Sequence, residues 1–187
     1  LVYNGLLAFD FAHLRAASVL GRIGLAWMFA ASIVLHTRTT RARLAWLAGL
    51  LLGYWAALTP VPRPGFGAGN LAPGATLTDW IDRQFLPGRL YRGVRDPEGL
   101  FGTVPAIGTA LLGMLAGDWL RREDLAEPRK VIGLALSAAA CFAGGALWAL
   151  VFPLNKNLWT SSFVLWTAGW SFALLALFYL VIDVWKL

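Results

Sequence analysis

The chain has 187 residues, of which 58% are hydrophobic and only 14% are charged, and its formal net charge is +6. A soluble domain carries roughly a quarter charged residues, and a fold of this size leaves too much surface exposed to hide so many apolar side chains. The composition therefore excludes an ordinary soluble domain and favours a membrane protein. Nucleic acid is not an expected partner, because basic loops at a membrane surface explain the positive charge more simply.

Five long apolar segments follow a mixed segment over residues 1–15. Each approaches the length of about 20 residues that a helix needs to cross about 30 Å of hydrocarbon. Lipid offers no hydrogen-bond partner to free backbone groups, so each segment is expected to be helical. The predicted fold is an all-α integral membrane protein, a polytopic helix bundle with about five transmembrane helices in a single transmembrane domain over residues 1–187. The expected spans are residues 16–36, 44–60, 103–120, 131–152 and 161–182.

The connectors between these spans differ in length and charge. Residues 37–43 and 121–130 are short and rich in Arg, whereas residues 61–102 form a long connector rich in Gly and Pro. Short basic connectors tend to remain on the cytoplasmic side of a membrane. We therefore expect loops 37–43 and 121–130 in the cytoplasm and loop 61–102 outside. The numbers of Lys and Arg on the two sides hardly differ, so this prediction depends on their density in the short loops.

Two pairs of glycines in the spans have the spacing that allows close helix approach. Gly49 and Gly53 are four residues apart, and so are Gly113 and Gly117. Small residues at this spacing let the backbones of neighbouring helices come together. We therefore expect helices to pack at these two positions.

Two carboxylates, Asp96 and Glu98, lie near the end of the long connector in the sequence Asp-Pro-Glu-Gly. Thr103 and Pro105 then predict the start of a helix, with Thr103 as its N-cap and Pro105 in its first turn. Carboxylates before a helix at the membrane surface can bind the hydroxyl or amino groups of a sugar, or act as acid and base. They can also cap the helix and complement its dipole. The residues alone leave both roles open.

The connector between the last two spans, residues 153–160, reads Pro-Leu-Asn-Lys-Asn-Leu-Trp-Thr. Asn155, Lys156 and Asn157 offer hydrogen-bond donors to a carbonyl, a phosphate or a sugar. Trp159 can stack on a sugar ring or anchor the chain at the membrane interface. Taken alone, a polar turn between two helices is the simpler interpretation of this connector.

Arg22 is the only charged residue well inside one of the five expected spans. A charge at this depth usually faces protein or water and marks a site or an ion pair. A side chain that reaches back to the outer surface is the alternative. His13 and His36 are the only histidines, and they are expected on opposite sides of the membrane. We therefore expect neither a Ser-His-Asp arrangement nor a metal site.

Four stretches of the chain form an ordered pattern: residues 19–25, 58–62 with 69–74, 96–103, and 153–161. Their order and spacing resemble the heparan-α-glucosaminide N-acetyltransferase family, particularly its bacterial NagX-type relatives. The resemblance covers nearly the whole chain. The Asp-Pro-Glu-Gly and Asn-Lys-Asn-Leu-Trp sequences are the most specific parts of it.

The resemblance implies a membrane acyltransferase that takes an acetyl group from cytoplasmic acetyl-CoA, its co-substrate, and delivers it to an amino sugar on the outer side. It implies that Asp96 and Glu98 contribute to the catalytic site. The catalytic histidine of the family is expected upstream of residue 1, and further helices are expected beyond Asp183. The chain is thus expected to be a central fragment that is inactive alone. Substrate binding is expected from Arg22, Asn155, Lys156, Asn157 and Trp159.

The expected partners are the lipid bilayer and an amino sugar or oligosaccharide, with a homodimer left open. The expected location is a bacterial inner membrane. An amino-sugar permease is the alternative function, in which the same polar groups bind the sugar without acyl transfer. A membrane protein with a purely structural role is a third interpretation. The four stretches argue against it, because loops without a role seldom contain so many matched polar residues.

Overall fold

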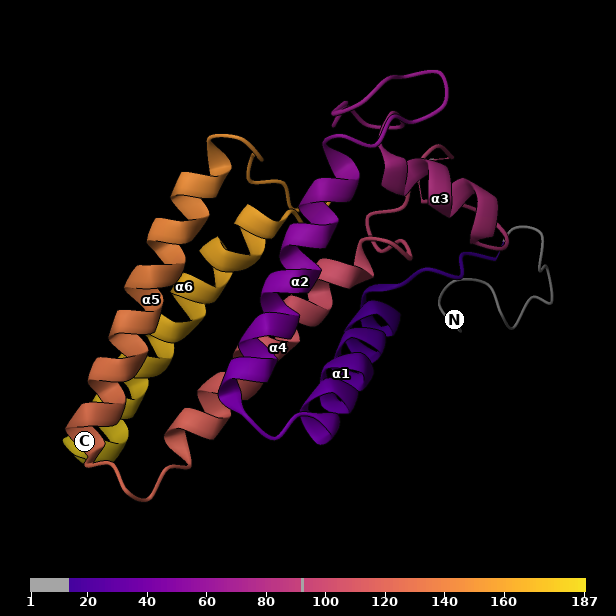
Figure 1. The fold of residues 1–187 in the computed structure, drawn as a ribbon. Helices are drawn as coiled ribbons and strands as arrows, with labels where there is room; N and C mark the ends of the chain where they lie inside the picture. The colour runs from indigo at the N-terminus through magenta and orange to yellow at the C-terminus, as the bar shows by residue number, and fades with distance from the viewer. Residues whose placement is uncertain (1–13, 92) are drawn as a thin grey trace.

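The structure is a computed structural model that describes residues 14–91 and 93–187. These residues form a helix bundle with a short helix near one end (Figure 1). They contain no strand, only two isolated β-bridges. The prediction of an all-α helical membrane bundle is confirmed over this part of the chain. The helices are α1 (Val19–His36), α2 (Thr40–Leu58), α3 (Leu77–Phe85), α4 (Thr103–Leu120), α5 (Glu127–Ala149) and α6 (Ser161–Tyr179), followed by the π-helical turn η3 (Leu180–Val184).

Four of the described segments are long and apolar enough to cross a membrane: α1, α4, α5, and α6 continued through η3. The second expected span corresponds to α2, which is also long but carries Arg41 and Arg43 in its first turn. These two charges lower its hydropathy below that of the other four. α2 begins before residue 44 because the Thr39 side chain caps it, accepting a hydrogen bond of 3.2 Å from the N–H of Ala42.

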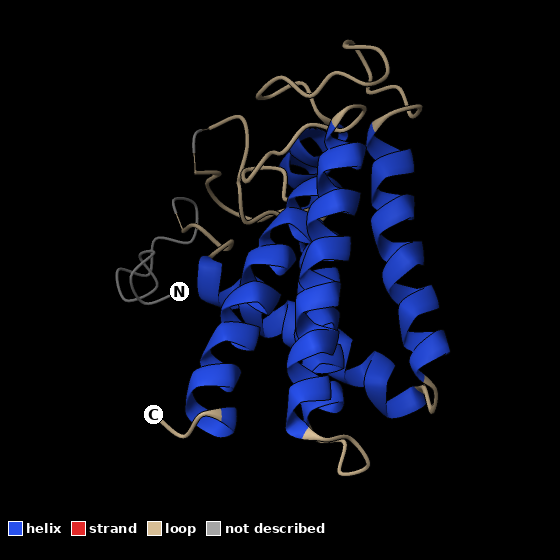
Figure 2. Ribbon diagram, turned by 90° about the vertical axis from the view of Figure 1, so that its left-hand side faces the viewer, coloured by secondary structure: helices blue, strands red, loops and turns tan. Residues whose placement is uncertain are grey.

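α4 lies at the centre of the bundle and contacts α1, α2 and α6. α5 and α6 form a long antiparallel hairpin that lies beside this group (Figures 1 and 2). Apolar side chains from the long helices fill the space between them. The core includes Leu51, Leu111, Leu134, Val164 and Phe172, of which Leu111 and Val164 are fully buried. Burial of this kind fixes the relative position of the helices that carry the polar residues described below.

The prediction of close helix approach at Gly49, Gly53 and Gly113 is wrong within the described chain, because a Cβ added at any of the three would have no neighbour within 4 Å. The close approach occurs instead at Gly145. A Cβ there would lie 2.9 Å from the backbone nitrogen of Trp166, so α5 and α6 touch backbone to backbone.

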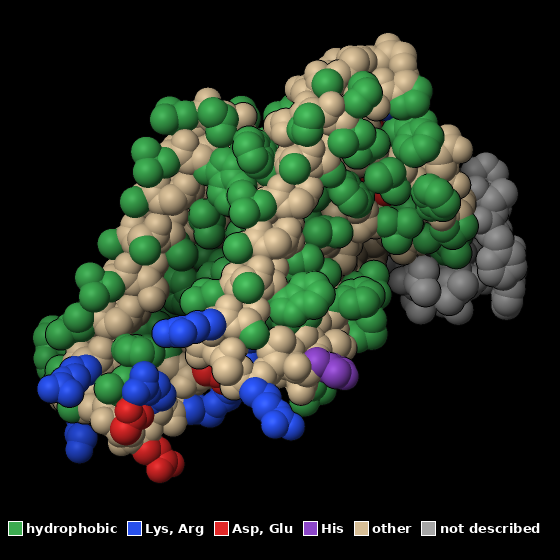
Figure 3. Space-filling model, viewed as in Figure 1, with side chains coloured by type: hydrophobic (Ala, Val, Ile, Leu, Met, Phe, Trp, Pro, Cys, Tyr) green, Lys and Arg blue, Asp and Glu red, His purple; other side chains and the backbone are tan. Residues whose placement is uncertain are grey.

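The long connector contains a helix that was not predicted. α3 begins with a capping box, in which the N–H of Asp79 donates to Thr76 Oγ1 at 3.1 Å and the N–H of Thr76 donates to Asp79 Oδ2 at 3.3 Å. Lys and Arg side chains gather at the other end of the bundle, near the α1–α2 and α4–α5 connectors (Figure 3). α3 and the loops before α4 and α6 thus lie at the end opposite to this basic surface.

Candidate functional site

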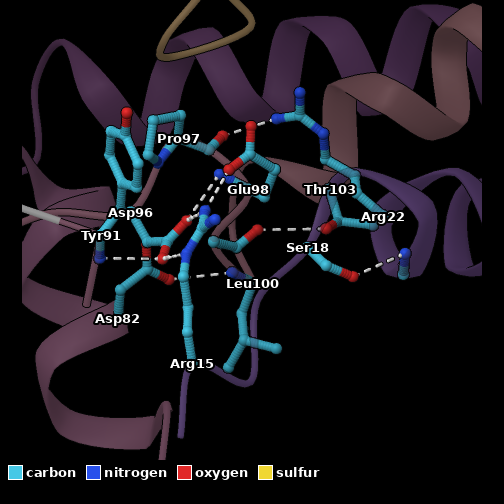
Figure 4. Close-up of polar contacts among 12 residues, drawn as sticks. Arg15, Ser18, Arg22, Asp82, Tyr91, Asp96, Pro97, Glu98, Leu100 and Thr103 are labelled. Atoms are coloured by element: carbon cyan, nitrogen blue, oxygen red, sulfur yellow. Dashed lines mark hydrogen bonds and ion pairs between the residues drawn. The ribbon is translucent and has the colours of Figure 1, made fainter. Parts of the chain in front are cut away.

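Arg15, just before α1, binds both carboxylates of the Asp-Pro-Glu-Gly sequence (Figure 4). Its Nε donates to Asp96 Oδ2 at 2.7 Å, and its Nη2 donates to Asp96 Oδ1 at 2.6 Å and also to Glu98 Oε2. The guanidinium lies 4.8 Å from the ring centroid of Tyr91. Two parallel hydrogen bonds to one carboxylate make this pair strong and fixed in direction.

Asp96 is held by Arg15 and by the backbone of its own loop. Its side chain is 0% exposed. Besides Arg15, its oxygens accept hydrogen bonds from the N–H of Tyr91 at 3.1 Å and from the N–H of Glu98 at 3.0 Å. Burial alone would raise the pKa of Asp96, but these hydrogen bonds hold the pKa below its usual value. The geometry therefore gives Asp96 the position of a loop anchor, while Glu98 lies nearer the surface.

Arg22 is buried on α1 and reaches toward this loop. Its Nη1 donates to the carbonyl oxygen of Pro97 at 2.6 Å (Figure 4). Its guanidinium also lies over the ring of Trp159, 4.2 Å from the centroid. Within the described residues Arg22 contacts a carbonyl group and an indole ring and has no carboxylate in an ion pair with it.

Trp159 connects three parts of the site. Its Nε1 donates to Thr109 Oγ1 on α4 at 3.1 Å, and its ring packs edge-on against Phe163 of α6. Its φ of 53° is in the left-handed region that a residue with a side chain rarely adopts. The tight connector before α6 imposes this conformation, and the indole is thereby directed at Arg22 rather than away from the bundle.

The polar residues before Trp159 separate into different environments. Asn155 Oδ1 accepts hydrogen bonds from the N–H groups of Asn157 and Leu158, at 2.9 and 3.2 Å, so it holds the turn together. Asn157 borders a small enclosed space beside Asp96 and Pro97. Lys156 is exposed, and its side chain forms no hydrogen bond or ion pair within the part of the chain that the structure describes; its carbonyl oxygen accepts from the N–H of Trp159 at 3.3 Å.

A cavity of about 430 Å³ brings Arg22, Glu98, Lys156 and Trp159 together. These residues come from three of the four stretches noted in the sequence. Thr109, which sequence reasoning missed, adds a hydroxyl group from α4. Such a lining offers hydrogen-bond acceptors, cationic groups and aromatic surface to a small polar molecule. The remaining wall is apolar and consists of Val19, Ile23, Ala26, Trp27, Ala106 and Ala110.

Asp82 of α3 is a second residue that sequence reasoning missed. It is 1% exposed, and its Oδ1 accepts a hydrogen bond of 2.9 Å from the N–H of Leu100 (Figure 4). No Lys or Arg pairs with it among the described residues. Burial, together with the negative charges of Asp96 and Asp79, raises the pKa of Asp82 to about 7. No motif in the Gly- and Pro-rich connector singles out Asp82, and only the three-dimensional fold reveals its burial.

The start of α4 differs in one detail from the prediction. Gly102 is the N-cap, and Thr103 is the first helical residue. The prediction of Thr103 as the cap is therefore wrong, because its hydroxyl donates to the carbonyl oxygen of Gly99 at 3.1 Å and so ties the helix to the loop before it. Pro105 lies in the first turn, as predicted.

The histidines do not contribute to the cavity in the described part of the chain. His36 lies at the other end of α1, where its ring Nδ1 is 2.8 Å from the carbonyl oxygen of Ser32. His13 lies outside the described residues. Across residues 14–91 and 93–187, no group of three or more His, Cys, Asp or Glu side chains is arranged to hold a metal ion.

No family model matches the chain. Two known proteins are similar to it. One is the human heparan-alpha-glucosaminide N-acetyltransferase, which is 29% identical over a region covering 96% of this chain. The other is the mouse protein of the same name, which is 31% identical over 74% of this chain. The chain spans 34% of the length of the human protein and 26% of the length of the mouse protein.

Proposed function

The chain is related at the level of the family to the heparan-α-glucosaminide N-acetyltransferases, and from this premise we propose that it forms part of a membrane acetyltransferase whose acceptor is an amino sugar. The donor in this proposal is acetyl-CoA. The observation that carries the proposal is the cavity in which Glu98, Arg22, Lys156 and Trp159 meet. These residues belong to stretches that are far apart in the sequence, and the fold brings them to one place.

Glu98 is the residue we assign to the amine of the acceptor. Its Oε2 is bound by Arg15, and its Oε1 makes no hydrogen bond within residues 14–91 and 93–187. Of the cavity-lining residues that the structure describes, Glu98 alone carries a carboxylate. A carboxylate fixed on one side and open on the other can orient an amino group and accept its proton. Asp96 contributes indirectly, because it fixes the backbone on which Glu98 is placed.

The reaction forms a bond between the amine nitrogen and the carbonyl carbon of the thioester, and it breaks the bond from that carbon to sulfur. The coenzyme leaves as a thiolate, and the amine loses one proton to a base. Negative charge develops on the carbonyl oxygen as the nitrogen attacks. Lys156 and Arg22 are the cations of the cavity lining, and a cation placed near this oxygen lowers the barrier to the attack.

The orientation in the membrane is part of the same proposal. The cavity lies at the end of the bundle that carries α3. On the face that Figure 3 draws, Lys and Arg side chains cluster at the opposite end, around the short connectors. Basic residues concentrate in short cytoplasmic loops. We therefore assign loops 37–43 and 121–130 to the cytoplasm, and the cavity and loop 61–102 to the outer side.

The proposal is tested by acetyl transfer from radiolabelled acetyl-CoA to glucosamine in membranes that contain the complete protein. Glu98→Gln is expected to reduce transfer at least tenfold, which corresponds to about 1.4 kcal/mol of transition-state stabilisation. Glu123→Gln is the matched control, because Glu123 is exposed and lies in the α4–α5 connector at the other end of the bundle.

Two outcomes would contradict the proposal. A well-folded wild-type protein that acetylates none of several amino sugars would exclude the transfer reaction. Equal transfer by the wild type and by Glu98→Gln would exclude the role of Glu98. Uptake of amino sugar into proteoliposomes without acetyl-CoA, together with absent transfer, would establish the permease instead.

A further inference from the structure

The carboxyl group of Asp82 occupies the space that a side chain at position 99 would need. A Cβ added to Gly99 would lie 1.7 Å from Asp82 Oδ2, and its three nearest neighbours all belong to the Asp82 carboxyl group. On the next residue, the N–H of Leu100 donates to Asp82 Oδ1 at 2.9 Å. Asp82 thus touches the backbone directly after Glu98, although Asp82 belongs to α3 and Glu98 to the loop before α4.

The same short loop sets the position of two groups at the cavity. Glu98 lines the cavity, and the carbonyl oxygen of Pro97 accepts the hydrogen bond from Arg22. On the other side of the loop, the Thr103 hydroxyl donates to the carbonyl oxygen of Gly99. A displacement of residues 99 and 100 would therefore move both the carboxylate and the partner of the buried arginine.

We propose that Asp82 is a positioning residue of the site, which holds the loop of residues 97–100 so that Glu98 and the Pro97 carbonyl group face the cavity. The proposal rests on the function proposed above for Glu98. α3 is suited to this task because its capping box fixes its first turn, and Asp82 follows on the buried side of the helix. Positioning by a buried residue away from the reacting atoms can change a rate by one to two orders of magnitude, roughly a hundredfold at the upper end.

The protonation state of Asp82 determines how well it can hold the loop. The charged and titratable groups around it are Asp79 on α3, Asp96 and Arg95 in the loop before α4, and Tyr54 on α2. Burial is the main reason that the pKa of Asp82 is raised to about 7, and the negative charges of Asp96 and Asp79 raise it further in the same direction. Below this pH the neutral acid fits the buried space. Above it, the carboxylate still accepts the hydrogen bond from Leu100, but a buried negative charge with no cationic partner among the described residues faces Asp96. Water can reach this charge only if α3 and the loop separate, so the loop is expected to loosen.

The test measures acetyl transfer by the complete protein between pH 5.5 and 8.5. Asp82→Asn keeps the shape of the side chain and cannot ionise. We expect the KM for glucosamine to rise about fivefold or more above pH 7 in the wild type relative to Asp82→Asn. A loop that separates from α3 gives up the hydrogen bond from Leu100 to Asp82, which corresponds to about 1 kcal/mol. The ionisation of glucosamine itself is the same in both assays, so the ratio of the two KM values isolates Asp82. Parallel profiles in the two proteins would overturn the proposal.

A compensating pair of substitutions provides a second measurement. Gly99→Ala alone is expected to reduce transfer at least tenfold, because the new methyl group collides with the Asp82 carboxyl group. Asp82→Ala in the same chain removes the atoms that cause the collision, so the double variant should recover part of the lost transfer. Equal losses in the single and double variants would show that Asp82 does not hold this loop.

Hydrogen exchange separates this proposal from the proposed function. If the wild type transfers no acetyl group, the enzymatic proposal fails, and the protection of peptides covering residues 96–102 decides the positioning role. After correction for intrinsic exchange rates, wild-type protection should fall above pH 7, and Asp82→Asn should keep it. The same pH dependence in both proteins would overturn the role of Asp82 in holding the loop.

Discussion

The guanidinium of Arg22 lies 4.2 Å from the ring centroid of Trp159, and this stacked pair joins α1 to the connector before α6. The same guanidinium donates to the carbonyl oxygen of Pro97. One side chain therefore contacts two of the loops that line the cavity. A planar group can stack and donate at its edge at the same time, whereas an ammonium group acts as a compact point charge.

Arg22→Lys is accordingly expected to impair the site although it conserves the charge. We expect at least a tenfold loss of acetyl transfer, since both the stacking on Trp159 and the directed hydrogen bond to Pro97 are weakened. Arg38→Lys serves as the control, because Arg38 is exposed in the α1–α2 connector. If Arg22→Lys and Arg38→Lys transfer acetyl groups equally well, the stacked geometry has no role in the reaction.

The pair of Arg15 and Asp96 gives a prediction about stability. Arg15→Gln leaves the fully buried carboxylate of Asp96 without its cation, which costs on the order of 3–5 kcal/mol. The melting temperature of Arg15→Gln in detergent should be clearly lower than that of the wild type. Arg122→Gln is the matched control and should change little, because Arg122 and its partner Asp124 are both exposed. A further Asp96→Asn substitution should restore part of the stability lost in Arg15→Gln, and no restoration would argue against the buried pair.

The pH dependence of stability has a defined sign at Asp82. Its pKa of about 7 in the folded state is above the ordinary value of 3.8, so the folded protein binds a proton that the unfolded chain releases. The free energy of unfolding should therefore decrease as the pH rises from about 4 to 7, by on the order of 4 kcal/mol for a shift of this size. The contribution of Asp96 to stability changes with pH in the opposite direction. Because its pKa is lowered in the folded protein, its ionised form stabilises the fold at pH values above the ordinary pKa of Asp, and this contribution is lost on acidification.

Unfolding measured at pH 5 and pH 8 checks this prediction. The wild type should be less stable at pH 8 than Asp82→Asn, and the difference should be smaller at pH 5. Asp183→Asn is a suitable control, since Asp183 is exposed near the end of the chain. If the difference in unfolding free energy between the wild type and Asp82→Asn is the same at pH 5 and at pH 8, the buried carboxyl group does not titrate in this range.

The hydrophobic segments predicted the helices well because membrane spans are defined by length and local composition, which a single sequence contains. The helix α3 was harder to predict, since a nine-residue helix with a polar face lacks the long apolar segment that marks a membrane span. Its Thr-x-x-Asp start was the one local signal available. The glycine spacing failed for a related reason. Small residues four apart indicate where a neighbouring helix could come close. The packing of the core decides which of these positions a neighbouring helix actually contacts.

The site was only partly predictable. Arg22, Glu98, Lys156 and Trp159 stand out in the sequence and share one cavity. Arg15 gave no such signal, because its carboxylate partner Asp96 is 81 residues away and no periodic pattern connects them. Pairings of this kind depend on tertiary structure. Here they decide that Asp96 is buried and that Glu98, two residues further on, faces the cavity.

The contact of α5 with α6 leads to a last prediction. Gly145→Ala would place a methyl group 2.9 Å from the backbone nitrogen of Trp166 and 3.1 Å from the carbonyl oxygen of Ser162. Backbone atoms cannot move aside as a side chain can, so the hairpin must separate, at a cost of about 1–3 kcal/mol. Gly113→Ala, in open space on α4, should be neutral or slightly stabilising, because Ala favours a helix by about 1 kcal/mol over Gly. Thermal unfolding of both variants in detergent distinguishes the two effects. A Gly145→Ala protein as stable as Gly113→Ala would mean that α5 and α6 lie further apart than the structure has them.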